Sequence, residues 1–271
     1  MSLTNKIDFA VIFVVKNANP NGDPINGNRP RTTFDNLGEV SDVCIKRKIR
    51  NRLMEQGHGI FVQSDDNRID EFVSLRKRAE SVLPKKGASD EKAKKACETW
   101  LDVRAFGQVF AFTGKKKGEG LSIGIRGPVS IHPAFSVDKV EVVSNQITKS
   151  VSSEGDGSSK GSDTMGMKHR IEKGIYTFYG SMNPQLASKT GFSDEDAEAI
   201  KAVLPKLFEN DASSARPEGS MEILNMIWWA HNCPNGQMSS AKIHRSLTVS
   251  SDGSIQFEDI GEPKPEVIAG F

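Results

Sequence analysis

The pattern of apolar and polar positions predicts β-strands that are separated by helices and polar insertions. Residues 7–16 are nearly continuously apolar, as expected of a strand that is buried on both faces or central in a sheet. Four later segments are also rich in β-branched, aromatic or alternating apolar residues. The strands that we predict are therefore residues 7–16, 100–112, 121–131, 174–180 and 220–231.

Two amphipathic helices are predicted between these strands. Ser41 or Asp42 is suited to cap the first helix, which should end at the glycines of residues 57–59. The second helix should begin at the acidic cap of residues 193–196 and continue to Phe208. Residues 65–98 are highly charged and prone to form helix, with a break at residues 83–89, so they are expected to form a helical insertion outside the sheet.

Without the insertions, the predicted order is strand, helix, strand, a long hairpin with a further strand, helix, strand. This is the βαββαβ pattern of an α+β fold of the ferredoxin-like or RRM-like type, with the helices on one face of the sheet. Residues 152–162 are rich in glycine and serine and should form a mobile tip or a linker. A hairpin is predicted around residues 251–253, and the acidic tail of residues 258–271 is expected to be peripheral.

Composition narrows the class of protein. The 271 residues include 36 Lys and Arg against 35 Asp and Glu, so the net charge is only +1 and any contact with nucleic acid must come from a local patch. The three cysteines are far apart and form no CxxC pair, which fits a reducing compartment and favours neither disulfides nor a zinc site. The N-terminus lacks the apolar core of a signal peptide, and the apolar runs are too short to span a bilayer. We therefore expect a cytoplasmic protein with no membrane partner.

Positive charge is concentrated in a turn-rich loop, residues 17–36, and in the helix that follows it. Lys and Arg supply charge, whereas Asn side chains and loop N–H groups supply neutral donors to phosphate and sugar oxygens. The alternative is an ordinary solvated helix face, but two adjacent sources of phosphate donors favour a track for a polyanion. The candidate RNA-binding residues of this region are Asn19, Asn21, Asn28, Arg29, Arg31, Lys46, Arg47 and Arg50.

Two further segments combine apolar and cationic side chains. In residues 165–170, a methionine is able to slide between unstacked bases while a neighbouring cation holds the flanking phosphates; the alternative is a strand edge with Met in the core. In residues 104–107, Phe106 offers a stacking face and Gly107 permits close approach, whereas the alternative is a packed core strand with Arg104 paired to Asp102. The candidates added by these segments are Arg104, Phe106, Met165, Met167, Lys168, His169 and Arg170.

Catalytic templates are not found in the sequence. There is no phosphate-binding P-loop, no HExxH and no GxSxG motif. The five histidines are dispersed without the spacing of metal ligands, so neither a metal nor another cofactor is expected. His169, beside Lys168 and Arg170, is a possible acid or base for RNA cleavage, although such a residue is more often a phosphate contact.

Four blocks in a fixed order resemble a known family. They are Asn19-Pro-Asn-Gly-Asp-Pro24, residues 40–51, Asp102-Val-Arg-Ala-Phe-Gly107, and Met165-Gly-Met-Lys-His-Arg170 leading to Gly174-Ile-Tyr176. Together they resemble the repeated backbone subunit of type I CRISPR Cascade complexes, of the RAMP superfamily, and most closely the subtype I-C branch. The resemblance extends from about Ile7 to about Trp229.

The resemblance implies one domain over residues 1–271, in which an RRM-like palm carries a helical finger at about 56–98 and a β-hairpin thumb at about 144–170. It further implies that copies polymerise as a filament along a CRISPR RNA (crRNA), that each thumb displaces one base beside Met165 or Met167, and that the exposed guide pairs with target DNA. The implied subunit is non-catalytic. It works with other Cascade subunits and a recruited helicase-nuclease in antiviral defence.

Three alternatives remain open on the sequence alone. One is an RRM-like endoribonuclease that processes precursor crRNA and depends on His169. A related variant cuts target RNA with a metal held by Asp23 or Asp35. The third is a protein-interaction scaffold that binds no nucleic acid.

Overall fold

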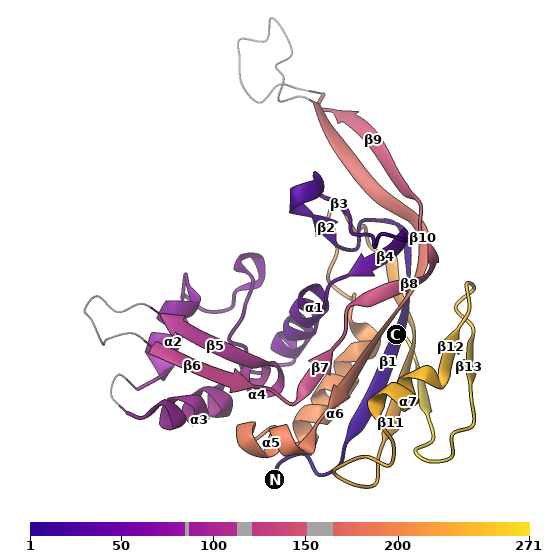
Figure 1. The fold of residues 1–271 in the computed structure, drawn as a ribbon. Coiled ribbons are helices and arrows are strands. Elements are labelled where there is room, and N and C mark those ends of the chain that lie inside the picture. The colour runs from indigo at the N-terminus through magenta and orange to yellow at the C-terminus, as the bar shows by residue number, and fades with distance from the viewer. Residues whose placement is uncertain (85–86, 113–120, 151–164) are drawn as a thin grey trace, which may run out of the picture.

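The computed structural model describes residues 1–84, 87–112, 121–150 and 165–271 (Figure 1). The glycine- and serine-rich segment predicted as a mobile tip, residues 152–162, lies outside the described residues. The chain forms a mixed α/β structure around one large antiparallel sheet with the strand order β14-β11-β1-β10-β8-β4, while β7 and β9 pair separately with β10. The strands of this sheet are β1 (Ile7–Ala18), β4 (Leu37–Val40), β7 (Val129–Ile131), β8 (Ala134–Lys139), β9 (Val142–Thr148), β10 (Met165–Met182), β11 (Met221–Ala230) and β14 (Glu266–Ala269).

Strand β1 is the centre of the sheet, as its apolar sequence predicts. Phe9 pairs with Gly180 of β10 on one side and with Trp228 of β11 on the other. Its side chains alternate between two cores: Phe9 and its odd-numbered neighbours face one hydrophobic cluster, whereas Ala10 and its even-numbered neighbours face another. The prediction of a strand buried on both faces is confirmed.

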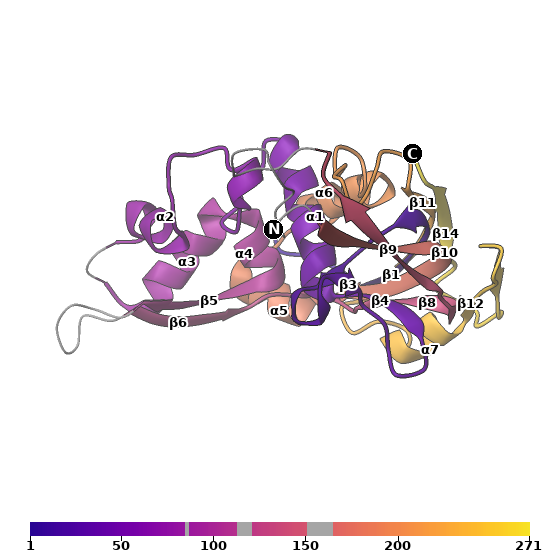
Figure 2. The same cartoon turned by 90° about the horizontal axis from the view of Figure 1, so that it is seen from above.

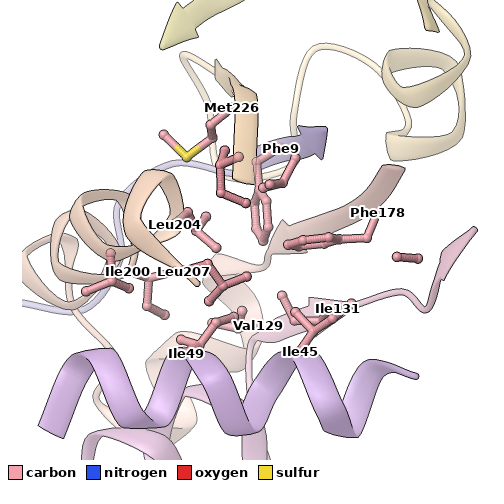
Figure 3. Close-up of a cluster of buried hydrophobic side chains, with 14 of the residues drawn as sticks. Phe9, Ile45, Ile49, Val129, Ile131, Phe178, Ile200, Leu204, Leu207 and Met226 are labelled. Carbon is pink, nitrogen blue, oxygen red and sulfur yellow. The ribbon is translucent and has the colours of Figure 1, made fainter. Parts of the chain in front are cut away.

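Helices α1 (Asp42–Glu55) and α6 (Asp194–Val203) cover one face of the sheet. Figure 3 shows Ile45 and Ile49 of α1 pointing toward Phe178 of β10 and toward Leu204 and Leu207, which follow α6. The opposite face is covered by α7 (Ser240–Arg245) with β12 (Leu247–Val249) and β13 (Ile255–Phe257). Strands β12 and β13 form the hairpin predicted around residues 251–253.

A side lobe with its own core projects from the main sheet (Figures 1 and 2). It consists of the short helix η2 (Asp65–Asn67), α2 (Leu75–Val82), α3 (Ser89–Thr99), α4 (Leu101–Phe106) and the hairpin β5 (Gly107–Phe112) and β6 (Leu121–Arg126). Phe61, Trp100 and Phe110 pack with ring centroids 4.7 to 6.4 Å apart at its centre. The predicted helical insertion is therefore helical as expected, but a β-hairpin completes its core.

The prediction of a strand over residues 100–106 is wrong. Residues 101–106 form α4. Leu101 and Ala105 contribute to the main core, whereas Trp100 and Val103 contribute to the lobe core. Residues three or four positions apart share one face of a helix, so this division fits a helix and not a strand. The strand begins only at Gly107. This residue has a φ of 78° and lies so close to the carbonyl oxygen of Ile125 that a side chain would collide with it.

Three shorter segments complete the description. The predicted loop of residues 17–36 contains a small hairpin of β2 (Gly22–Asp23) and β3 (Arg29–Pro30), with the turn η1 (Pro24–Asn26) between them. Helix α5 (Pro184–Thr190) precedes α6, and η4 (Leu204–Lys206) follows it. The tail is less peripheral than predicted, since β14 pairs with β11 at the sheet edge.

Strand β9 and the beginning of β10 extend beyond the body of the sheet as a two-stranded arm, residues 142–148 and 165–171 (Figure 1). The arm leaves the sheet near Asn17, which has a φ of 52°. A left-handed residue inside a strand bends the chain, and β1 ends one residue later.

Candidate nucleic-acid interface

Asparagine side chains hold the loop of residues 17–36 against the start of α1. Asn19 is buried, and its Nδ2 donates to the carbonyl oxygen of Asn28 at 2.7 Å. The Oδ1 atom of Asn21 accepts from the backbone N–H of Ser41 at 3.0 Å and from its hydroxyl at 2.8 Å. These predicted site residues therefore organise the loop, and only Asn28, which is exposed with a φ of 61°, lies at its surface.

Ser41 links the loop to the helix. Its hydroxyl oxygen also accepts from the N–H of Cys44, which is the N-cap interaction that the sequence predicts. Within the same loop, Arg31 lies 3.5 Å from the carboxylate of Asp23. Arg29 is half-buried on β3 and has no ion-pair partner within the described part of the chain.

The cations of α1 are more strongly paired than the sequence suggests. Lys46 lies 2.9 Å from Asp42 one turn earlier. Arg47, Lys48 and Arg216 all converge on Asp211, with Arg47 at 3.6 Å and Arg216 at 3.1 Å. Because three cations meet one carboxylate, this end of α1 keeps a local surplus of positive charge.

The Asp211 cluster shows how burial and pairing compete. Burial lowers the pKa of Lys48, although its ion pair with Asp211 acts in the opposite direction. Burial would raise the pKa of Asp211, but Lys48, Arg216 and Arg47 together hold it below its ordinary value. Sequence reasoning missed Asp211 and Arg216, which lie more than 150 residues after α1 and carry no local motif.

Three predicted site residues lie elsewhere, where the lobe joins the sheet. Arg50 donates to Asp102 at 2.9 Å and lies over the ring of Phe106 at 5.2 Å. Asp102 also accepts the N–H groups of Phe61 at 2.7 Å and of Val62 at 3.0 Å, so it is fully engaged. The structure therefore separates Arg50 and Phe106 from the loop at the other end of α1.

Arg104 does not pair with Asp102, the partner that the sequence suggested. Its guanidinium instead makes two bonds to Asp196, at 2.7 and 2.8 Å, and thereby ties α4 to the capping box of α6. The pair lies in a cleft of about 940 Å³ between α3, β6 and the α5–α6 connection.

The arm presents two different faces. Residues that pair across antiparallel strands share a face, so Met165, Met167 and His169 lie on one side with Thr148, Gln146 and Ser144. We call this the Met face. Met165 is 64% exposed and Met167 56% exposed, so neither is a core residue, contrary to the alternative left open by the sequence. His169 Nδ1 lies 2.8 Å from the hydroxyl of Ser144.

The other side of the arm is the basic face, formed by Ile147, Lys168 and Arg170. Strand β3 of the loop contacts β10 at the base of the arm, and the start of α1 adjoins the same loop (Figure 1). The structure thus brings together the loop, the N-terminal half of α1 and the arm. These are three of the segments that the sequence singled out.

Three histidines that are dispersed in the sequence come together in space, away from the arm. His231 Nε2 lies 2.9 Å from Asp8 Oδ2, and His244 Nε2 lies 3.5 Å from Asp8 Oδ1. The ring of His132 meets that of His244 edge-on with centroids 5.7 Å apart. Even so, within the described ranges no group of three or more His, Cys, Asp or Glu residues is arranged to hold a metal ion.

Comparison with known proteins identifies the family. The family model described as "CRISPR-associated protein Cas7" matches residues 5–264. This chain belongs to the Cas7 family. A curated relative, the CRISPR-associated protein Cas7 of Haloferax volcanii, is 29% identical over 232 residues, which cover 79% of this chain and 67% of the relative.

A solved structure agrees with the fold of this Cas7 family member. A chain of a structure titled "CRISPR RNA-guided surveillance complex, pre-nicking" aligns with a TM-score of 0.50 and 14% identity, over 92% of this chain and 84% of that one. A chain of a "CRISPR RNA-guided surveillance complex" aligns with a TM-score of 0.49 and 17% identity, over 92% and 78%. In the described residues of this chain, no helix has the length and apolar character needed to cross a membrane.

Proposed function

We propose that this Cas7 family member is a non-catalytic crRNA-binding backbone subunit of a cytoplasmic Cascade complex, most like subtype I-C. The observation that carries the proposal is the grouping of the loop, the start of α1 and the arm at one end of the sheet. Family membership, and the likeness in fold to a chain of an RNA-guided surveillance complex, support guide RNA as the proposed ligand. In such a complex, copies polymerise along the guide and present it for pairing with target DNA.

The fold supports the same proposal. The strand order β11-β1-β10-β7, with α1 and α6 on one face, is consistent with the proposed RRM-like palm. The side lobe then corresponds to the finger and the arm to the thumb. In this proposal the finger includes β5 and β6 as well as residues 56–98, because Phe110 and Ile123 of these strands belong to the lobe core.

In the proposed binding mode, the loop and α1 contact the guide phosphates, and the arm contacts a base. Lys46 and Arg47, together with Arg29 and Arg31, hold guide phosphates, because charge contacts of this kind are independent of base sequence. Met165 or Met167 contacts a displaced base through its exposed thioether side chain. Other Cascade subunits and a helicase-nuclease recruited for target cutting are the further partners of this assignment.

Charge reversal on α1 tests the proposal. The double variant Lys46→Glu, Arg47→Glu should bind an unstructured 30-nucleotide RNA at least tenfold more weakly at 150 mM NaCl, measured by fluorescence anisotropy. The log–log salt slope should also fall, by about 0.7 for each phosphate that the variant no longer neutralises. The matched control is Lys242→Glu, Arg245→Glu, which reverses two exposed cations on α7 at the opposite face.

Equal affinity in the α1 variant and the wild type would overturn the assignment of α1. The same reactions test the absence of catalysis, because RNA recovered after incubation should be full-length in EDTA and in Mg²⁺. Shortened products that depend on His169 would instead favour the endoribonuclease alternative.

A further inference from the structure

Two methionines of the arm are exposed, although methionine is one of the residue types that are most often buried. Met165 is 64% exposed and Met167 is 56% exposed, whereas Met182, at the other end of the same strand, is 0% exposed. Thioether sulfur is oxidised to a sulfoxide where an oxidant reaches it, and a side chain in the core is shielded from the oxidant. The structure therefore makes both methionines of the Met face accessible to a small oxidant.

The sulfur of Met165 already has a hydrogen-bond donor. The Nε2 atom of Gln146 donates to Met165 Sδ at 3.6 Å across the arm. Gln146 is the residue directly opposite Met167, and Thr148 is directly opposite Met165; both are exposed. A thioether sulfur is only a weak acceptor, whereas the oxygen of a sulfoxide is a polar one. The Met face thus carries donors that are able to hold an added oxygen beside either methionine.

Oxidation changes what the Met face is able to contact. A flexible apolar side chain becomes polar and chiral. An apolar side chain enters a gap between unstacked bases without losing hydrogen bonds of its own, whereas a sulfoxide must give up its hydration or its bond to Gln146. The oxidised arm should therefore contact a displaced base less favourably than the reduced arm.

We propose that Met165 and Met167 are sites of reversible oxidation by peroxide, and that their sulfoxides weaken the contact of the arm with the guide. The modification itself goes beyond the proposed function, but its effect on the guide rests on that function. The phosphate contacts proposed for Lys46 and Arg47 contain no sulfur, so oxidation weakens the RNA complex without abolishing it.

The reaction consumes one molecule of peroxide for each methionine. The sulfur lone pair attacks one oxygen of hydrogen peroxide, so that the S–O bond forms while the O–O bond breaks. The proton of the transferred oxygen moves to the departing oxygen, which leaves as water; sulfur is oxidised by two electrons and peroxide is reduced. Methionine sulfoxide reductases, one for each configuration at sulfur, reverse the step with two thiols, which become a disulfide while the oxygen leaves as water.

Peptide mass spectrometry tests the choice of sites without RNA. The protein for this test carries Cys44→Ser and Cys233→Ser, so that peroxide does not act through the two partly exposed thiols. Limited treatment with hydrogen peroxide should oxidise Met165 and Met167 at least tenfold faster than Met182. Equal rates at the three positions would overturn the assignment of the sites.

RNA binding by the same protein tests the consequence. After both arm methionines are oxidised, it should bind an unstructured 30-nucleotide RNA at least fivefold more weakly at 150 mM NaCl, measured by fluorescence anisotropy. The sulfoxide reductases with dithiothreitol should restore the affinity. Because oxidation adds no charge, the log–log salt slope should stay the same, unlike that of the charge reversal on α1. An unchanged affinity of the oxidised protein would overturn the inference.

Leucine variants assign the effect to the Met face, because leucine has a similar volume and no sulfur. In Met165→Leu, Met167→Leu, the affinities before and after peroxide treatment should be equal, whatever the starting affinity of the variant. The matched control is Met238→Leu, on the opposite face of the sheet, which should keep the full sensitivity to peroxide. A double variant as sensitive as the parent protein would contradict the inference.

Failure of the proposed function would give a different result. If the untreated protein binds no RNA, the effect on the guide fails together with the proposed function, while the mass spectra alone decide the oxidation sites. If it binds RNA, saturation with the 30-nucleotide RNA before treatment should slow the oxidation of Met165 or Met167 at least threefold. Unchanged rates at both positions would show that the Met face does not contact the guide and would overturn the proposed effect.

Discussion

Asp8 is a fully buried carboxylate at the start of β1. Burial would raise its pKa, but the hydrogen bond with His231 and the nearby His244, Ser240 and Lys6 outweigh this effect and hold the pKa well below its ordinary value. A depressed pKa means that the stabilising contribution is present above the unfolded-state pKa and is lost as the pH falls through the folded-state value. The cluster therefore stabilises the protein at neutral pH.

Replacement of this carboxylate should expose its contribution. Asp8→Asn should lower the free energy of unfolding by about 3 kcal/mol at pH 7, because the partners of Asp8 lose a buried charge. The difference from the wild type should shrink at pH 3, where the unfolded wild type is largely protonated. Urea denaturation at the two pH values measures it; an equal difference at both would contradict the account.

The burial of Cys97 in the lobe core gives a second prediction at this scale. Burial raises the pKa of its thiol to about 11, so the contribution to stability is complete below pH 9 and declines as the pH rises toward 11. At pH 8, reaction of Cys97 with a thiol reagent should be at least tenfold slower than that of the half-buried Cys44. Mass spectrometry of the modified peptides compares the two rates.

The candidate site was predictable residue by residue only in part. Local sequence identified the cations of α1, the loop and the exposed methionines of the arm, because charge and turn residues are local signals. It did not show that Asp211 neutralises part of this charge or that Asp102 and Asp196 bind Arg50 and Arg104. Such partners lie 50 to 165 residues away, and only the tertiary fold brings them together.

Among the elements, α1 combines a proposed binding role with a structural role along its length. Its N-terminal half adjoins the loop and the proposed guide, whereas Arg50 in its C-terminal half binds the buried Asp102 and so fastens the lobe. Cations one turn apart on the same helix are therefore expected to respond differently to substitution.

A comparison of two alanine variants tests this division. Arg50→Ala should lower the free energy of unfolding by about 3 kcal/mol, because it leaves the carboxylate of Asp102 buried without its charged partner. Lys46→Ala should change it by less than about 0.5 kcal/mol, since its pair with Asp42 is partly exposed. Thermal denaturation of both variants provides the measurement, and similar losses would contradict the division.

The predictions of helices and strands were correct where the apolar residues follow one clear periodicity. They were wrong where the apolar residues of one segment are shared between two cores. Strand β1 and helix α1 follow the sequence closely, because each has a clear apolar pattern. Residues 100–106 were misassigned since their apolar side chains serve the main core and the lobe core in turn, which resembles a continuous strand pattern. Strand β14 was missed because its short, largely exposed sequence carries little signal.

At the scale of the whole molecule, two hydrophobic cores imply two levels of stability. The lobe core is built from few residues around Phe61, Trp100 and Phe110, whereas the main core extends through the sheet and both of its helices. Smaller cores bury less apolar surface and open at lower free energy.

Hydrogen exchange should resolve these levels. Amides of β5 and β6 should exchange through a lower-energy opening than those of β1, which is hydrogen-bonded on both sides. Phe110→Ala should accelerate exchange in the lobe strongly, while β1 changes by less than threefold. Equal acceleration of both regions would indicate one cooperative unit instead.

The central position of β1 also has a consequence for synthesis on the ribosome. Its two neighbours, β10 and β11, begin at Met165 and Met221, so the apolar run of residues 9–15 in β1 emerges long before either partner exists. At translation rates of about 5–20 residues per second, β1 waits roughly 10–40 seconds for β11 to be completed. During that time the nascent chain exposes a continuous apolar β-segment, and chaperones that hold extended apolar chains are expected to bind it there.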